Sequence, residues 1–217
     1  MSKLTREFVK KALDAQSVWD LGNEVLYKLC RDHPGHSDDD AIIAKTLLIG
    51  RVYAASLERR RKADVKGDEF YTKQVTSVFR TSEMDRWLQS LKEDAGGSPQ
   101  KAIEIHKKLT DLLRSITNFD NRSFASKYLH FHFPTRFYIF DNRADKSASK
   151  LAKLDRGRNR SGNTDPKYAE FCARCDQLSN LIQGLIGRVP SPREVDKVLL
   201  HWEGDRIRGQ VRTRNLD

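Results

Sequence analysis

The stretch Asn121–Ala152, NRSFASKYLHFHFPTRFYIFDNRADKSASKLA, carries most of the information on fold and function. It predicts a helix over 122–131, a short extended loop, and a second helix that begins at Asp141. Phe133-Pro134 ends the first helix, because proline cannot continue it. Apolar residues at helical spacing give each helix a face for a core, and three more bury the loop: Phe137, Ile139 and Phe140.

Helical patterns of the same kind extend over nearly the whole chain. They predict further helices at about 5–15, 18–31, 39–62, 68–80, 83–93, 99–116, 166–186 and 192–203. The start signals are Ser82 with Asp85, Ser98-Pro99, Asp165-Pro166, and Ser191-Pro192 with Glu194. Only 136–140 resembles a strand. We therefore expect an all-α fold of nine or ten helices in a compact single-domain array, with one short extended loop before Asp141.

The domain organisation is expected to be simple. Residues 1–203 should form one all-α domain, and Gly96-Gly97 marks the point where it could divide into two layers. The polar and basic segment 155–165 is expected to be a surface loop. The tail 204–217 carries four arginines and few apolar residues, so we expect it to be loosely ordered.

The composition favours a polyanionic partner. Forty Lys and Arg against thirty Asp and Glu give a net charge of +10, which favours nucleic acid. No apolar run is long enough to span a membrane, and the first residues have no apolar segment typical of a secretion signal. Three cysteines do not make a disulfide framework, so a reducing cytoplasm is the expected location.

Lys127 and Asp141 are the candidate catalytic pair. Lys127 interrupts the apolar face of its helix, and a partly desolvated amine can act as a nucleophile. Asp141, at the start of the next helix, could stabilise a cationic centre on a sugar. The alternatives are structural: Lys127 would be a solvent-facing residue of an amphipathic helix, and Asp141 would only cap a helix.

A lysine-bearing helix, a short apolar loop and an aspartate that opens the next helix resemble the layout of the helix–hairpin–helix DNA glycosylase superfamily, in particular its 8-oxoguanine glycosylase-like members. Ser126-Lys127 matches the lysine of that layout, and Phe140-Asp141 matches the end of the loop and the aspartate. The resemblance implies that DNA is the nucleic-acid partner, that Lys127 attacks C1′ of the sugar and that Asp141 assists. The family's Gly-x-Gly turn has no counterpart in Thr117–Arg122, and the spacing from lysine to aspartate is shorter than usual.

The glycosylase hypothesis gives roles to neighbouring residues, because an excised base must first be flipped into a pocket. The candidate pocket residues are Tyr128, His130, His132, Phe137, Lys45 and Arg51. For Arg51 the structural alternative is an ion pair that holds helices together. Phosphate contacts are expected from basic residues after Asp141, namely Arg143, Lys146, Lys150, Arg156, Arg158 and Arg160.

Two rival functions remain open. Arg31 and His36, separated by four residues, resemble the short active-site motif of the HEPN family of helical ribonucleases. There the histidine would help to move the proton of the 2′-hydroxyl, and we expect His36 to lie in an exposed turn. The second rival is a non-catalytic basic helical module that binds nucleic acid or a partner protein.

Cys172-Ala173-Arg174-Cys175 is a CxxC sequence, which can indicate zinc. Cys30, His33 and His36 could complete a set of ligands. Because the two cysteines lie one turn apart in a predicted helix, we expect buried thiols instead. We expect no metal, no cofactor and no obligate protein partner.

Overall fold

The computed structural model describes residues 4–15, 18–62, 65–94, 96–154 and 163–214 of the chain. All regular structure in these ranges is helical, and no strand occurs among them, so the fold is all-α as predicted. The segments α4 (Gly67–Glu69), η2 (Phe70–Val75, a π-helix) and α5 (Thr76–Thr81) follow one another directly. Counted as one helix, they bring the described residues to ten helices and one 3-10 turn, η1 (Leu57–Arg60).

The chain divides into two units. Unit 1 contains Met1–Gln16, Tyr138–Arg160 and Pro166–Asp217, and unit 2 contains Ser17–Phe137 and Ser161–Asp165. One of the boundaries between the units falls in the loop between Phe137 and Tyr138. Gly96-Gly97, where the sequence suggested a split into layers, lies inside unit 2.

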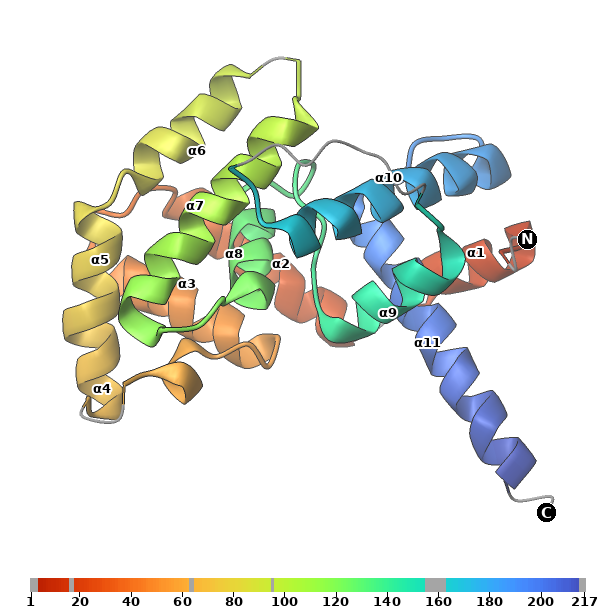
Figure 1. The fold of residues 1–217 in the computed structure, drawn as a ribbon, viewed down its shortest axis with the longest axis horizontal. Helices are drawn as coiled ribbons and strands as arrows, with labels where there is room; N and C mark the ends of the chain where they lie inside the picture. The colour runs from red at the N-terminus through yellow and green to blue at the C-terminus, as the bar shows by residue number, and fades with distance from the viewer. Residues whose placement is uncertain (1–3, 16–17, 63–64, 95, 155–162, 215–217) are drawn as a thin grey trace. The chain divides into compact units, whose positions relative to one another are not determined.

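Unit 2 is built around α8 (Arg122–His132), which packs against α2 (Val18–Asp32), α3 (Asp39–Val52) and α7 (Pro99–Thr117) (Figure 1). Eight of the eleven residues of α8 are buried. A helix that is covered on all sides must satisfy its polar side chains with partners inside the protein. Those partners form the candidate site described below.

Unit 1 packs four helices together: α1 (Arg6–Asp14), α9 (Asn142–Leu151), α10 (Pro166–Ile186) and α11 (Pro192–Arg214). The buried face of α9 has only small side chains, which allow close packing: Ala144, Ser147 and Ala148. Asp141 caps this helix, as the sequence predicts.

Local start signals are confirmed at two more helices. Ser98 accepts a hydrogen bond from the Lys101 amide at the start of α7. At α11, the Glu194 carboxylate accepts from the Ser191 amide at 2.8 Å and the Ser191 hydroxyl accepts from the Glu194 amide at 3.2 Å, which is the predicted capping box. Helix α11 continues to Arg214, beyond its predicted end near Glu203.

The predicted long helix over 39–62 is wrong in its second half. Helix α3 ends at Val52, Ala54 adopts a positive φ of 51°, and the Ala55 amide donates to the Gly50 carbonyl at 2.8 Å. The turn brings Ser56 against Gly50, where a Cβ would lie only 3.0 Å from the Ser56 Cα. A tight turn over residues 50–56, here called the tight return, therefore replaces the second half of the predicted helix. It needs glycine at position 50 because Ser56 packs so closely there.

The predicted start of α6 (Met84–Glu93) from Ser82 and Asp85 is also only partly right. The Ser82 hydroxyl does accept from the Met84 amide at 3.2 Å. Asp85, however, does not return to Ser82, because its carboxylate binds His36 instead. A long-range partner has displaced the local one.

Candidate functional site

Helix α8 carries Lys127 on a part of its surface that water does not reach. The Lys127 side chain is 1% exposed. Its Nζ donates to the hydroxyl of Ser123, one turn earlier, at 2.7 Å, and lies 5.6 Å from the centre of the Tyr53 ring. The expectation of a lysine inside a buried helix is confirmed, and the alternative of a solvent-facing lysine is wrong.

A second polar group of α8, Tyr128, ends a chain of hydrogen bonds that begins at the surface. Asp85 Oδ1 lies 2.5 Å from His36 Nδ1, and His36 Nε2 lies 2.6 Å from the Tyr128 hydroxyl. Because a carboxylate only accepts, Nδ1 of the neutral imidazole carries the proton and Nε2 accepts from the Tyr128 O–H. The Asp85 carboxylate also accepts from the His36 amide at 3.1 Å.

Burial has the largest effect on the pKa values of the groups in this hydrogen-bonded chain from Asp85 to Tyr128. Loss of water around His36, together with nearby Lys45, lowers its pKa to about 4, although Asp85 acts in the opposite direction. Burial likewise raises the pKa of Tyr128. The two rings are therefore neutral near pH 7. For Asp85, partial burial acts to raise the pKa of the carboxyl group, but the hydrogen bonds from the His36 ring and amide, together with nearby charge, lower it overall.

Lys45 positions the loop that carries His36. Its Nζ is fully buried and donates to the carbonyl oxygens of His33 and Gly35, both at 2.8 Å. Burial lowers the pKa of Lys45 to about 8. The amine thus holds a turn that has no regular structure of its own.

His130, on another face of α8, also has hydrogen-bond partners at both of its ring nitrogens. Its Nδ1 lies 2.8 Å from the Phe137 carbonyl and its Nε2 lies 2.7 Å from the Tyr27 hydroxyl. The carbonyl accepts from Nδ1–H, so Tyr27 donates to Nε2. Phe137 itself belongs to the core of unit 2.

His132 differs from these two histidines in having a buried Nε2 without a hydrogen-bond partner among the described residues. Its ring centre lies 5.0 Å from that of Tyr128 and 5.5 Å from that of His36. Burial, with the charge of Lys45, lowers the pKa of His132 well below its ordinary value. Of the predicted pocket residues, Tyr128, His132 and Lys45 are thus brought to one cluster around His36.

Arg51, the remaining predicted pocket residue, lies elsewhere in unit 2. Its guanidinium is exposed and pairs with Glu58 Oε1 at 2.8 Å. This contact joins α3 to η1, as in the structural alternative. Glu58 also accepts a hydrogen bond from Tyr71.

Asp141 lies in unit 1, at the start of α9, and its two carboxylate oxygens differ. Oδ1 accepts from the amides of Arg143 and Ala144, both at 2.8 Å. No described residue donates a hydrogen bond to Oδ2. One oxygen therefore caps the helix, and the other is open to a ligand.

Three of the predicted phosphate-binding residues follow Asp141 along α9. Arg143, Lys146 and Lys150 are exposed and occupy positions i, i+3 and i+7, which lie on one face of a helix. None of the three forms an ion pair with a described residue, whereas Asp145 on the same helix lies 3.7 Å from both Lys167 and Arg174. The remaining three predicted contacts, Arg156, Arg158 and Arg160, lie outside the described residues.

The position of His36 differs from the one that the ribonuclease hypothesis expects. His36 does not lie in an exposed turn: it is 2% exposed, and both of its ring nitrogens have protein partners. Arg31 is exposed near the end of α2. A histidine committed to Asp85 and Tyr128 has no free nitrogen for the proton of a 2′-hydroxyl.

The cysteines are buried thiols. Cys172 and Cys175 both lie in α10 of unit 1, and burial raises the pKa of Cys175. Cys30 is buried in unit 2, where burial raises its pKa to about 12. Among the described residues, no three His, Cys, Asp or Glu side chains are grouped in a way that could hold a metal ion.

The sequence does not predict the residues that complete these clusters, above all Asp85, Tyr27 and Ser123. Asp85 was assigned to a helix cap, and nothing near Tyr27 points to a histidine far along the chain. Ser123 alone had a local signal, because it precedes Lys127 by one helical turn.

Comparison of the chain with protein-family models, curated proteins and solved structures finds no match in any of the three. Within the part of the chain that is described, every helix is too short or too polar to cross a membrane.

Proposed function

We propose that this protein binds DNA through the sugar–phosphate backbone and excises a modified base. In this proposal Asp141 stabilises the sugar cation, Lys127 is the nucleophilic amine, and the cations of α9 contact phosphates. The observation that carries the proposal is the arrangement on α9, where an open carboxylate oxygen is followed by three exposed cations without ion pairs: Arg143, Lys146 and Lys150.

The chemistry of base excision calls for such groups. When the bond between the base nitrogen and C1′ breaks, the electron pair leaves with the base and positive charge develops on the sugar. A carboxylate oxygen near that charge lowers the barrier. An amine that then bonds to C1′ loses a proton and forms a Schiff base as the sugar ring opens.

The proposal for Lys127 rests on unit 2 alone. Its Nζ is removed from water and touches the Ser123 hydroxyl at 2.7 Å, the kind of environment in which lysine amines act as nucleophiles. Both Asp141 and Lys127 also match the residues that the family resemblance assigns to these roles.

A covalent trapping experiment tests the proposal. Duplex oligonucleotides with a panel of oxidised, alkylated and hypermodified bases are incubated with the protein and sodium borohydride, which reduces a Schiff base to a stable adduct. We expect the wild type to be trapped and Lys127→Gln to give no adduct while it retains DNA binding. Lys73→Gln, which alters an exposed lysine of the same unit, is the matched control and should be trapped normally.

A second candidate is a non-catalytic module that binds nucleic acid. The full burial of Lys127 favours it, because an amine that water does not reach must be uncovered before it can meet a sugar. Wild-type protein that binds the whole panel, releases no base and forms no adduct would establish this module and reject base excision.

A further inference from the structure

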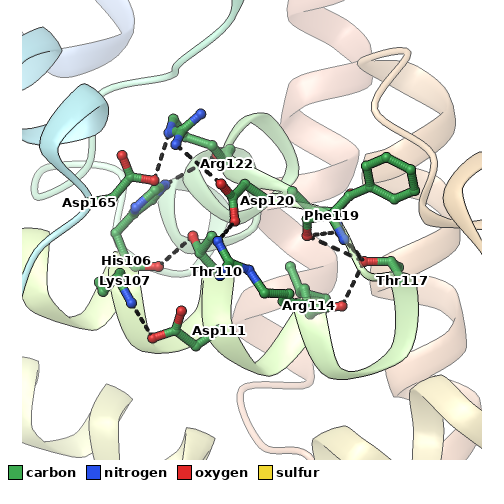
Figure 2. Close-up of polar contacts among 12 residues, drawn as sticks. His106, Lys107, Thr110, Asp111, Arg114, Thr117, Phe119, Asp120, Arg122 and Asp165 are labelled. Atoms are coloured by element: carbon green, nitrogen blue, oxygen red, sulfur yellow. Dashed lines mark hydrogen bonds and ion pairs between the residues drawn. The ribbon is translucent and has the colours of Figure 1, made fainter.

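The loop between α7 and α8 presents an aromatic ring to solvent. Phe119 is 52% exposed, although large apolar side chains are usually covered. Figure 2 shows its ring pointing away from the polar contacts at the base of the loop. An exposed ring of this kind is either a contact for a binding partner or has no role. A loop backbone that is fixed by hydrogen bonds and ion pairs favours the first interpretation.

The backbone on both sides of Phe119 is fixed by hydrogen bonds. Asn118 adopts a left-handed conformation with a φ of 60° that ends α7. The Phe119 amide donates to the Thr117 hydroxyl at 3.3 Å, and the Phe119 carbonyl accepts from Asn121 Nδ2 at 3.1 Å. The Asn121 amide group also donates to the Thr117 hydroxyl at 2.6 Å. The backbone that carries the exposed Phe119 ring is therefore fixed before any ligand binds.

Ion pairs tie the same loop to the rest of unit 2 (Figure 2). Asp120 pairs with Arg114 and lies 3.8 Å from Arg122, whose Nε donates to Asp165 Oδ2 at 2.6 Å. His106 lies 3.1 Å from the Arg122 carbonyl. A loop whose backbone is already fixed loses less conformational entropy when a ligand binds.

Positive charge adjoins the ring. The Arg60 guanidinium carbon lies 5.6 Å from the centre of the Phe119 ring. Arg60 belongs to a run of four exposed cations, Arg59-Arg60-Arg61-Lys62. Neither Arg59 nor Arg60 forms an ion pair with a described residue, while Arg61 is engaged by the carbonyl oxygens of Glu58 and Val65 at 2.8 Å.

We propose that Phe119 and the cations of 59–62, here called the Phe119 platform, bind an unpaired nucleotide of a single-stranded nucleic acid. The base stacks on the Phe119 ring, and the flanking phosphates contact Arg59 and Arg60. Aromatic faces beside arginines are the features by which proteins hold single strands without sequence preference. The inference rests on the nucleic-acid partner of the proposed function and does not depend on base excision.

Direct binding to short oligonucleotides tests the platform. Fluorescence anisotropy is measured with a labelled twelve-nucleotide oligothymidine, with the corresponding oligouridine and with a blunt duplex of equal length. Phe119→Leu keeps an apolar side chain but has no aromatic face, so we expect it to weaken single-strand binding about tenfold. Phe119→Trp should bind at least as tightly as the wild type.

Two further variants separate stacking from charge and from apolar area. Arg60→Gln should weaken binding and reduce the slope of log K against log salt by about one. Leu21→Ala removes an exposed apolar side chain from the same unit, and should leave binding unchanged. Equal losses for DNA and RNA single strands indicate recognition of the base face, and a loss for one alone adds a contact to the sugar.

The inference is overturned if Phe119→Leu binds single strands within twofold of the wild type, or if the wild type binds no single strand. It is also overturned if Phe119→Trp loses as much affinity as Phe119→Leu. Borohydride trapping by Lys127 fails or succeeds independently of these results, so the two proposals can be told apart.

Discussion

Asp141 joins a structural and a chemical role in one side chain. Oδ1 accepts from two backbone amides and Oδ2 is open. Asparagine caps helices about as well as aspartate, but it has no negative charge to offer a sugar cation. The two roles can therefore be separated by one substitution.

We expect Asp141→Asn to leave the thermal midpoint nearly unchanged and to slow base release on the order of a hundredfold. The measurement is single-turnover release from the modified-base duplex on which the wild type is active. Asp38→Asn is the control, because Asp38 caps α3 through the Asp40 amide in the same way, and it should not alter the rate. Full activity in Asp141→Asn would reduce Asp141 to a cap.

At the scale of elements, α9 combines that cap with a row of cations. Each phosphate that a cation neutralises releases counterions, so the dependence of binding on salt counts such contacts. From the net charge of +10 we expect the wild type to have a log–log slope on the order of −4 to −8, for about five to nine phosphate contacts.

Replacing the α9 cations together should make that slope shallower. For Arg143→Gln, Lys146→Gln and Lys150→Gln combined, we expect a loss of about one unit of slope per residue. The control removes the same charge from exposed cations that each pair with a carboxylate three or four residues away, namely Lys28→Gln, Lys73→Gln and Arg86→Gln. Equal slopes in the two triple variants would show that net charge alone governs binding.

The end of α3 offers a structural prediction. A Cβ on Gly50 would lie 3.0 Å from the Ser56 Cα and 3.5 Å from the Ser56 nitrogen, so the backbone would have to move. We expect Gly50→Ala to lower the free energy of unfolding by about 1–3 kcal/mol. Gly22→Ala, inside α2 with no heavy atom within 4 Å of the added Cβ, should raise it by about 0.5–1 kcal/mol. Urea denaturation measures both, and an equally stable Gly50→Ala would refute the tight return.

At the scale of the whole molecule, buried neutral histidines make stability depend on pH. Burial lowers the pKa of His36, His106 and His132 from the ordinary value of 6.5. Unfolded chains therefore bind protons below pH 6.5 that the folded protein does not bind. Stability is complete above that pH and is lost as the pH falls toward the folded pKa, which is about 4 for His36.

We expect the free energy of unfolding to fall between pH 7 and pH 5 by on the order of 2 kcal/mol for each of His36 and His106, whose pKa values are lowered to about 4. His132 should add to the fall in the same direction. Urea denaturation at intervals of half a pH unit measures the fall. His36→Gln, which removes one of the three groups, should make the dependence shallower even if it lowers stability at pH 7. A free energy that stays constant down to pH 5 would contradict the neutral state of the cluster around His36.

The sequence by itself determined the fold class and most helix starts, because those depend on residues close to one another. The caps at Ser98, Asp141 and Ser191 form within three residues of the amides they bind. The dense apolar pattern of 122–131 also sufficed to predict a buried helix, since its side chains have few polar positions to offer to water. The candidate residues Lys127 and Asp141 came from the same stretch.

Only the tertiary structure decided which polar groups meet. Asp85 and His36 are 49 residues apart and Tyr27 and His130 are 103 residues apart, so no local pattern announces either pair. Asp85 could have capped its own helix, but its carboxylate binds His36 instead. Buried polar groups must find partners, and packing determines which partner is within reach. For that reason the helices could be predicted from the chain, while the hydrogen-bonded cluster around α8 required the fold.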